Sequence, residues 1–127
     1  MKYLLDTHTA IWALGDTTKL SETAKAIFDD ISIPLYISII SAWEIAIKAS
    51  IGKLNYVGGA AFFLDKMQIN GVELLNIASA HLTQVENMPF FHRDPFDRLL
   101  IATAKVEGMT VITADENISK YDIPVVW

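Results

Sequence analysis

The chain has 127 residues, of which 52% are hydrophobic and 20% charged, with a formal net charge of −5 and no cysteine. This length and composition predict a single domain over residues 1–127 and exclude a disordered chain, disulfides and thiolate metal sites. Charges interrupt the apolar runs and the N-terminus lacks a signal-peptide layout, so we expect a cytoplasmic protein with no membrane association.

The predicted strands and helices alternate along the chain. Strands are predicted at 3–5, 35–38, 72–77, 110–113 and 124–127. Helices are predicted at 9–14, 21–29, 41–51, 60–69, 79–86 and 95–107, with a helical turn at 116–121. The runs YLL, LYIS and TVIT are almost wholly apolar, as is typical of buried parallel strands. The order predicts an α/β fold: a three-layer α/β/α sandwich around a central, mostly parallel sheet of about five strands.

Four acidic residues lie where a predicted strand ends or a predicted helix begins: Asp6, Glu44, Asp97 and Asp115. Because the carboxyl ends of parallel strands share one edge, where ligands bind in open α/β sheets, we expect these acids to converge. Two carboxylates about 5 Å apart repel by roughly 3 kcal/mol at an effective dielectric near 20. A helix cap contributes only about 1 kcal/mol. Convergence therefore calls for a cation, and carboxylate donors without cysteine favour Mg²⁺ or Mn²⁺.

The same acids also have purely structural interpretations. Asp6 is suited to cap the helix that follows it, and Asp115 to cap the last helical turn. Ser41 and Glu44 match the capping box Ser-x-x-Glu, in which Glu44 reaches back to the amide of Ser41. Spacing alone leaves the structural and the chemical interpretations open.

The stretch HRDPFDR, residues 92–98, holds two acids with different expected roles. Asp94 precedes Pro95 and is a good N-cap for the following helix. Asp97 lies in the first turn of that helix, on the same face as Asp94, and is the one of the two that belongs to the four acids above. Asp94 remains a candidate for a supporting role through a water molecule.

Basic and histidine side chains also lie near these acids in the sequence. The candidates for phosphate contacts are Arg93, Arg98 and Lys48. Their alternative role is ion pairing, with Glu44 in the case of Lys48 and with the acids of HRDPFDR in the case of the arginines. The three histidines, His8, His81 and His92, lack a shared spacing and are not expected to act as general bases.

The sequence pI of about 5.0 argues against passive binding of nucleic acid, unless divalent ions bridge the acids to phosphate. Four segments nevertheless resemble the PIN-domain family of nucleases, and in particular the VapC toxin ribonucleases of type II toxin–antitoxin pairs. These segments are MKYLLDTHTAIWAL, SAWEIAIKASIGKL, HRDPFDRLLIATAKVEG and TVITAD. They occur in order over nearly the whole chain.

The resemblance implies an Mg²⁺- or Mn²⁺-dependent endoribonuclease that hydrolyses RNA with a metal-activated water. It also implies growth inhibition, silencing by a cognate antitoxin protein, and a homodimer. The acidic site of the family maps onto Asp6, Glu44, Asp97 and Asp115. Thr113 matches a hydroxyl residue that supports this site, and Thr7 is a further supporting candidate.

Two other function classes stay open at this point. An aspartate-based phosphohydrolase would use Asp6 as its nucleophile, but phosphatases of the haloacid-dehalogenase type need a second aspartate two residues later, where this chain has His8. A PIN-fold binding module would lack activity, and the complete set of acids counts against it.

Overall fold

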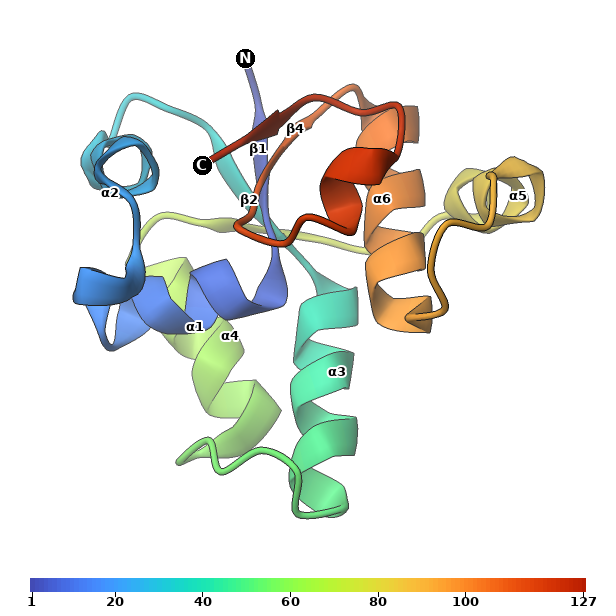
Figure 1. Cartoon of the computed structure of the whole chain (residues 1–127). Coiled ribbons are helices and arrows are strands. Elements are labelled where there is room, and N and C mark those ends of the chain that lie inside the picture. The colour runs from blue at the N-terminus through green and yellow to red at the C-terminus, as the bar shows by residue number, and fades with distance from the viewer.

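The computed structural model describes all 127 residues (Figure 1). Five strands form one parallel sheet in the order β3–β2–β1–β4–β5. The strands are β1 (Tyr3–Leu5), β2 (Leu35–Ser38), β3 (Glu73–Leu75), β4 (Thr110–Ile112) and β5 (Val125–Val126). The helices are α1 (Thr7–Leu14), α2 (Glu22–Asp29), α3 (Ile39–Ser50), α4 (Gly59–Ile69), α5 (Ser79–Asn87) and α6 (Pro95–Glu107). None of the helices combines the length and the apolar character needed to cross a membrane.

Each face of the sheet carries its own hydrophobic core. Successive side chains of a strand point to opposite faces, so Leu5 packs with α1 to α4 while Leu4 packs with α6. Figure 1 shows α1, α2 and α4 on one side of the strands and α5 and α6 on the other. The predicted α/β fold, with helices on both faces of a parallel sheet, is confirmed, and the sheet is parallel throughout.

The register of the three inner strands aligns their carboxyl ends. Leu5 pairs with Ile37 of β2 on one side and with Ile112 of β4 on the other. Asp6 and Thr113 are therefore the first residues beyond two neighbouring strands. Because α3 starts directly after β2, its first turns lie at the same edge.

Helix α6 has the bounds that the sequence predicts. Asp94 Oδ1 accepts hydrogen bonds from the amides of Phe96 at 2.9 Å and Asp97 at 3.1 Å, and Pro95 occupies the first turn. The helix ends at Gly108, whose φ of 66° lies in the left-handed region that favours glycine. Local capping signals thus fix both ends of this helix, and the predicted cap at Asp94 is confirmed.

Two other helix starts differ from the prediction by two residues, and α4 begins one residue early, at Gly59. Helix α1 begins at Thr7 rather than at residue 9, because Asp6 caps it directly. Helix α3 begins at Ile39 rather than at residue 41, because Ser38 Oγ accepts a hydrogen bond from the Ile40 amide at 3.0 Å. The capping box predicted between Ser41 and Glu44 is wrong: both residues lie inside the helix, and Glu44 is in its second turn.

Several shorter elements also differ. Strands β3, β4 and β5 are shorter than predicted, and the helical turn predicted at 116–121 is a 3₁₀ turn at Ile118–Lys120. A second 3₁₀ turn, at Thr17–Lys19, was not predicted. Asp16 begins it by accepting hydrogen bonds from the amide and hydroxyl groups of Thr18.

The Asp94 cap yields a stability prediction. Asp94→Ala is expected to lower the free energy of unfolding by about 1 kcal/mol, whereas Asp94→Asn keeps the cap and costs only a few tenths, since asparagine caps as well as aspartate. Both variants remove the same negative charge, so their difference isolates the cap. Urea denaturation measures it, and equal stability of the two variants would contradict the assigned role.

Candidate active site

Asp6 is buried at the carboxyl end of β1 and has partners on both oxygens. Its Oδ1 accepts from the Thr9 amide at 3.1 Å, and its Oδ2 accepts from the Thr113 hydroxyl just beyond β4. Burial raises the pKa of the Asp6 carboxyl above its ordinary value, although these hydrogen bonds act in the opposite direction. Thr113 therefore fixes the orientation of Asp6 from the neighbouring strand.

Glu44 lies in the second turn of α3, and its side chain is at the same carboxyl edge of the sheet as Asp6. Its Oε1 accepts from the Thr7 hydroxyl at 2.7 Å, and its Oε2 lies 2.5 Å from Lys48 Nζ. Thr7 Oγ1 also lies 2.9 Å from the Ser41 hydroxyl. The ion pair predicted between Lys48 and Glu44 is present, and this hydrogen bond raises the pKa of Lys48. Glu44 is thus a buried carboxylate that two neighbours hold in place.

Asp97 lies in the first turn of α6, with its side chain 21% exposed. Its pKa is raised to about 7, first by burial and then by the charges of Asp94, Asp115, Asp6 and Glu44. All four other acids therefore lie near enough to repel the ionised Asp97 carboxylate. The site carries an excess of negative charge in the absence of a cation.

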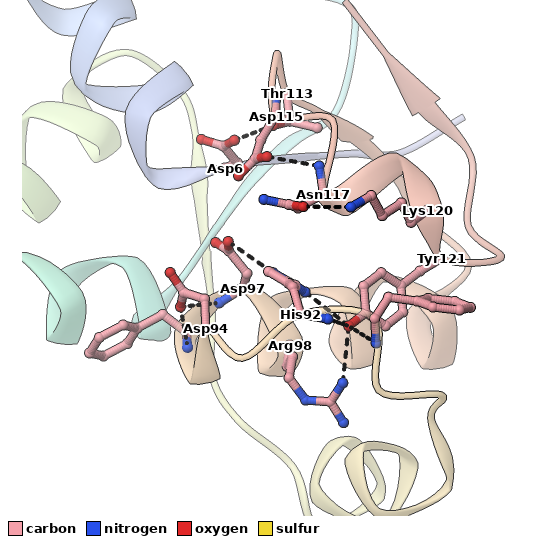
Figure 2. Close-up of polar contacts among 12 residues, drawn as sticks. Asp6, His92, Asp94, Asp97, Arg98, Thr113, Asp115, Asn117, Lys120 and Tyr121 are labelled. Atoms are coloured by element: carbon pink, nitrogen blue, oxygen red, sulfur yellow. Dashed lines mark hydrogen bonds and ion pairs between the residues drawn. The ribbon is translucent and has the colours of Figure 1, made fainter.

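Asp115 follows β4 and is held by a tight local turn. Its Oδ1 accepts from the Asn117 amide at 2.9 Å, while its own amide donates to Thr113 Oγ1 at 3.0 Å. The Thr113 hydroxyl thus contacts both Asp6 and Asp115 at the end of the strand (Figure 2).

The structure brings all four predicted acids together at one pocket of about 270 Å³. Thr7, Lys48 and Asp94 also line it, as do His8 and Trp12 of α1. The complete lining is Asp6, Thr7, His8, Trp12, Glu44, Lys48, Asp94, Asp97, Ala114 and Asp115. The pocket draws on four separate segments that meet at the carboxyl edge of the sheet.

The two arginines do not line this pocket. Arg98 is buried and points away from the acids: its Nη1 donates to the Pro89 carbonyl and to the Tyr121 hydroxyl, each at 3.0 Å (Figure 2). Its guanidinium also stacks 4.4 Å from the ring centre of Phe90. These contacts hold the Arg98 guanidinium away from the pocket. The prediction that Arg98 contacts phosphate or pairs with the acids of HRDPFDR is therefore corrected. Arg93 is exposed and forms no ion pair.

The histidines occupy three different environments. His8 is exposed at the pocket, whereas His81 is buried and links α5 to α6, with Nε2 2.8 Å from Glu107 Oε2 and Nδ1 accepting from the Ala78 amide. His92 lies beside Asp97, with Nε2 3.3 Å from Asp97 Oδ2, and its Nδ1 lies 2.9 Å from the Tyr121 hydroxyl. Sequence reasoning gave Tyr121 no role at the site, and no local motif marks it.

The donor chemistry of the pocket fits a hard divalent cation. All four converging groups are carboxylates, the ligands that Mg²⁺ and Mn²⁺ prefer. Burial is the first cause of the raised pKa of Asp97, and the second is repulsion by the neighbouring acids, which such an ion would relieve. As the side chains stand, no three His, Cys, Asp or Glu groups are arranged to hold an ion together.

Comparison with known proteins places this arrangement in a family. The family model described as PIN domain matches residues 3–124. A comparison with curated protein sequences finds no match.

Solved structures share the fold over nearly their full length. They include VapBC2 from Rickettsia felis bound to a promoter DNA fragment (14% identity, TM-score 0.71, covering 99% of this chain and 98% of that one). DNA-bound VapBC from Salmonella typhimurium is also similar (18% identity, TM-score 0.71, covering 99% of this chain and 97% of that one). So is a toxin–antitoxin complex from Klebsiella pneumoniae (19% identity, TM-score 0.60, covering 98% of this chain and 96% of that one). At these identities the likeness shows a common fold. With the family model matching almost every residue, the chain belongs to the PIN-domain family.

Proposed function

We propose that this protein is a divalent-metal-dependent endoribonuclease and the toxin of a toxin–antitoxin pair. The observation that carries the proposal is the meeting of four carboxylates from four segments in one pocket, where burial and then the neighbouring negative charges raise the pKa of Asp97 to about 7. Helix capping accounts for Asp6 and Asp94, but it leaves the burial of Glu44 and the crowding around Asp97 unexplained.

Asp6, Glu44, Asp97 and Asp115 are the residues that would hold Mg²⁺ or Mn²⁺. A bound divalent ion would supply Lewis acidity for the activation of water and positive charge for the phosphate. The protein contributes orientation: Thr113 holds Asp6, Thr7 holds Glu44, and the Asp94 cap fixes the start of α6 that carries Asp97.

The charge of the protein supports a role for metal in RNA binding. With a net charge of −5, the chain lacks the basic footprint of a passive nucleic-acid binder. Lys48 at the pocket and the exposed Arg93 are the cations proposed to contact phosphate. Most of the phosphate charge would then be met by the divalent ion.

An exposed apolar stripe supports a protein partner. Trp43 and Ile47 on α3 and Ile51, its C-cap residue, follow one another at intervals of four residues and are 50%, 38% and 59% exposed. The structural neighbours named VapBC or toxin–antitoxin complex contain such a partner. We therefore propose a cognate antitoxin and a homodimer as the assemblies of this chain.

Removal of metal tests the proposal. In Mg²⁺ or Mn²⁺ the purified protein is expected to cleave total cellular RNA at internal positions, EDTA to stop cleavage, and added Mn²⁺ to restore it. Gel electrophoresis with mapping of the cut ends measures the products. Cleavage that persists in EDTA would contradict the metal mechanism. An ion that binds without any cleavage would favour the binding module instead.

A further inference from the structure

We propose that His92 is a positioning residue for Asp97, and that Tyr121 and Arg98 fix the tautomer of the His92 ring. The proposal rests on the function proposed above, in which Asp97 is a metal ligand. It concerns a line of side chains that runs from Arg98 through Tyr121 and His92 to Asp97 (Figure 2).

The line begins at the Tyr121 hydroxyl, which is surrounded by hydrogen-bond donors. Arg98 Nη1 lies 3.0 Å from it, the Phe91 amide 3.2 Å and the His92 amide 3.3 Å. A hydroxyl has two acceptor lone pairs and a single proton. These three N–H groups fill the acceptor capacity of the oxygen, so its proton must point elsewhere.

The remaining neighbour of the hydroxyl is His92 Nδ1, at 2.9 Å. Tyr121 therefore donates to Nδ1, which is the acceptor nitrogen of the imidazole ring. The ring proton then sits on Nε2. Nε2–H faces Asp97 Oδ2 at 3.3 Å, so the tautomer that Tyr121 selects is the one that donates to the carboxylate.

The surroundings hold this line in one arrangement. Tyr121 is 5% exposed and His92 11%. Their rings pack edge to face with centres 5.4 Å apart, and the Phe91 ring also packs edge to face with Tyr121, with centres 5.0 Å apart. Arg98, on α6 one residue after Asp97, is anchored by the Pro89 carbonyl and Phe90. The buried arginine thus orients the hydroxyl.

The consequence for the site is a fixed Asp97 carboxylate. The hydrogen bond from His92 occupies Asp97 Oδ2. Asp97 lines the pocket, and its other oxygen, Oδ1, has no hydrogen bond to the protein. Histidines that ligate metals are oriented by carboxylates in the same way, and loss of such an outer partner typically costs about 10-fold to 100-fold in metal affinity or activity. Here the roles are reversed, and the histidine orients the carboxylate.

The first experiment needs no substitution. Nitrogen-15 NMR of the imidazole rings, in metal-free protein at alkaline pH where imidazole is neutral, is expected to show His92 with its proton on Nε2. In Tyr121→Phe, which keeps the ring but removes the hydroxyl, this preference is expected to weaken. A wild-type His92 ring protonated on Nδ1 would overturn the proposal.

The second experiment measures ion binding. His92→Phe is expected to weaken Mn²⁺ affinity in calorimetric titration by about 10-fold, and to lower kcat for RNA with little change in KM. His92→Gln, whose amide can donate to Asp97, is expected to restore part of both losses. His81→Gln is the control: it disturbs a buried histidine that does not line the pocket, so it is expected to lower the melting temperature without changing Mn²⁺ affinity.

The outcomes separate this inference from the proposed function. A His92→Phe protein that is folded and binds Mn²⁺ as tightly as wild type would overturn the positioning role. Failure of the wild-type protein to bind Mn²⁺ or to cleave RNA would instead overturn the nuclease proposal, and the tautomer measurement would still decide whether Tyr121 directs His92 toward Asp97.

Discussion

Asp97→Asn is expected to lower kcat for RNA cleavage by about 1000-fold while leaving the protein at least as stable as wild type near pH 7. A catalytic metal ion contributes several kcal/mol to transition-state stabilisation, and each 1.36 kcal/mol corresponds to about a tenfold change in rate. The stability follows from the crowding of the site, since the substitution removes a carboxylate that its neighbours repel. Cleavage assays and thermal unfolding measure the two effects.

The matched control for this substitution is Asp29→Asn. Asp29 is an exposed acid near the end of α2, outside the pocket, so its loss changes the net charge equally without touching the site. Its cleavage activity is expected to equal that of wild type. An active Asp97→Asn protein, or an equal loss in both variants, would show that Asp97 has no specific role in cleavage.

The second large effect concerns pH and divalent ions. Folding raises the pKa of Asp97 to about 7, mainly through burial, and burial also raises the pKa of Asp6. The folded protein therefore keeps protons that the unfolded chain loses near pH 4. Its free energy of unfolding is expected to fall as the pH rises from about 4 to about 7. The loss from Asp97 is on the order of 4 kcal/mol, because its pKa is displaced by about three units and each unit corresponds to about 1.4 kcal/mol.

Addition of Mn²⁺ is expected to reverse this loss above pH 7, where the carboxylates are ionised, and to have little effect near pH 5. Calorimetry across this pH range, with and without the ion, measures both curves. In Asp97→Asn the decline is expected to be shallower. A melting temperature that rises between pH 5 and pH 7 in metal-free wild type would contradict the raised pKa of Asp97.

The sequence predicted those parts of the fold that depend on local signals. Helix α6 has the predicted bounds because the residues that set them are adjacent to it in the sequence. Asp94 and Pro95 begin the helix, and Gly108 ends it. The meeting of Asp6 and Asp115 with the other acids was also predictable, because parallel strands place their carboxyl ends at one edge. Their catalytic roles stay predictions.

The differences arose where the outcome depends on tertiary contacts. Ser38 and Ser41 are both acceptable caps, and only the end of β2 decides that α3 starts after Ser38. Arg98 looked available for phosphate because nothing near it in sequence reveals Tyr121, a distant residue whose hydroxyl the guanidinium contacts. Two residues that are far apart in the chain, such as Arg98 and Tyr121, form no recognisable spacing pattern, so a single sequence does not reveal their contact.

The register of the inner strands also limits how the chain can change in length. Each residue added to a strand advances it by about 3.3 Å and reverses the side-chain direction. An insertion in β1 would therefore turn Leu4 and Leu5 toward the wrong cores and displace Asp6 from its pocket. Insertions in the loop at residues 51–58 would change neither the direction of Leu4 and Leu5 nor the position of Asp6. We therefore expect the loops to tolerate insertions and deletions. The three residues of β1 must keep their number, because that number sets the position of Asp6 relative to the neighbouring strands.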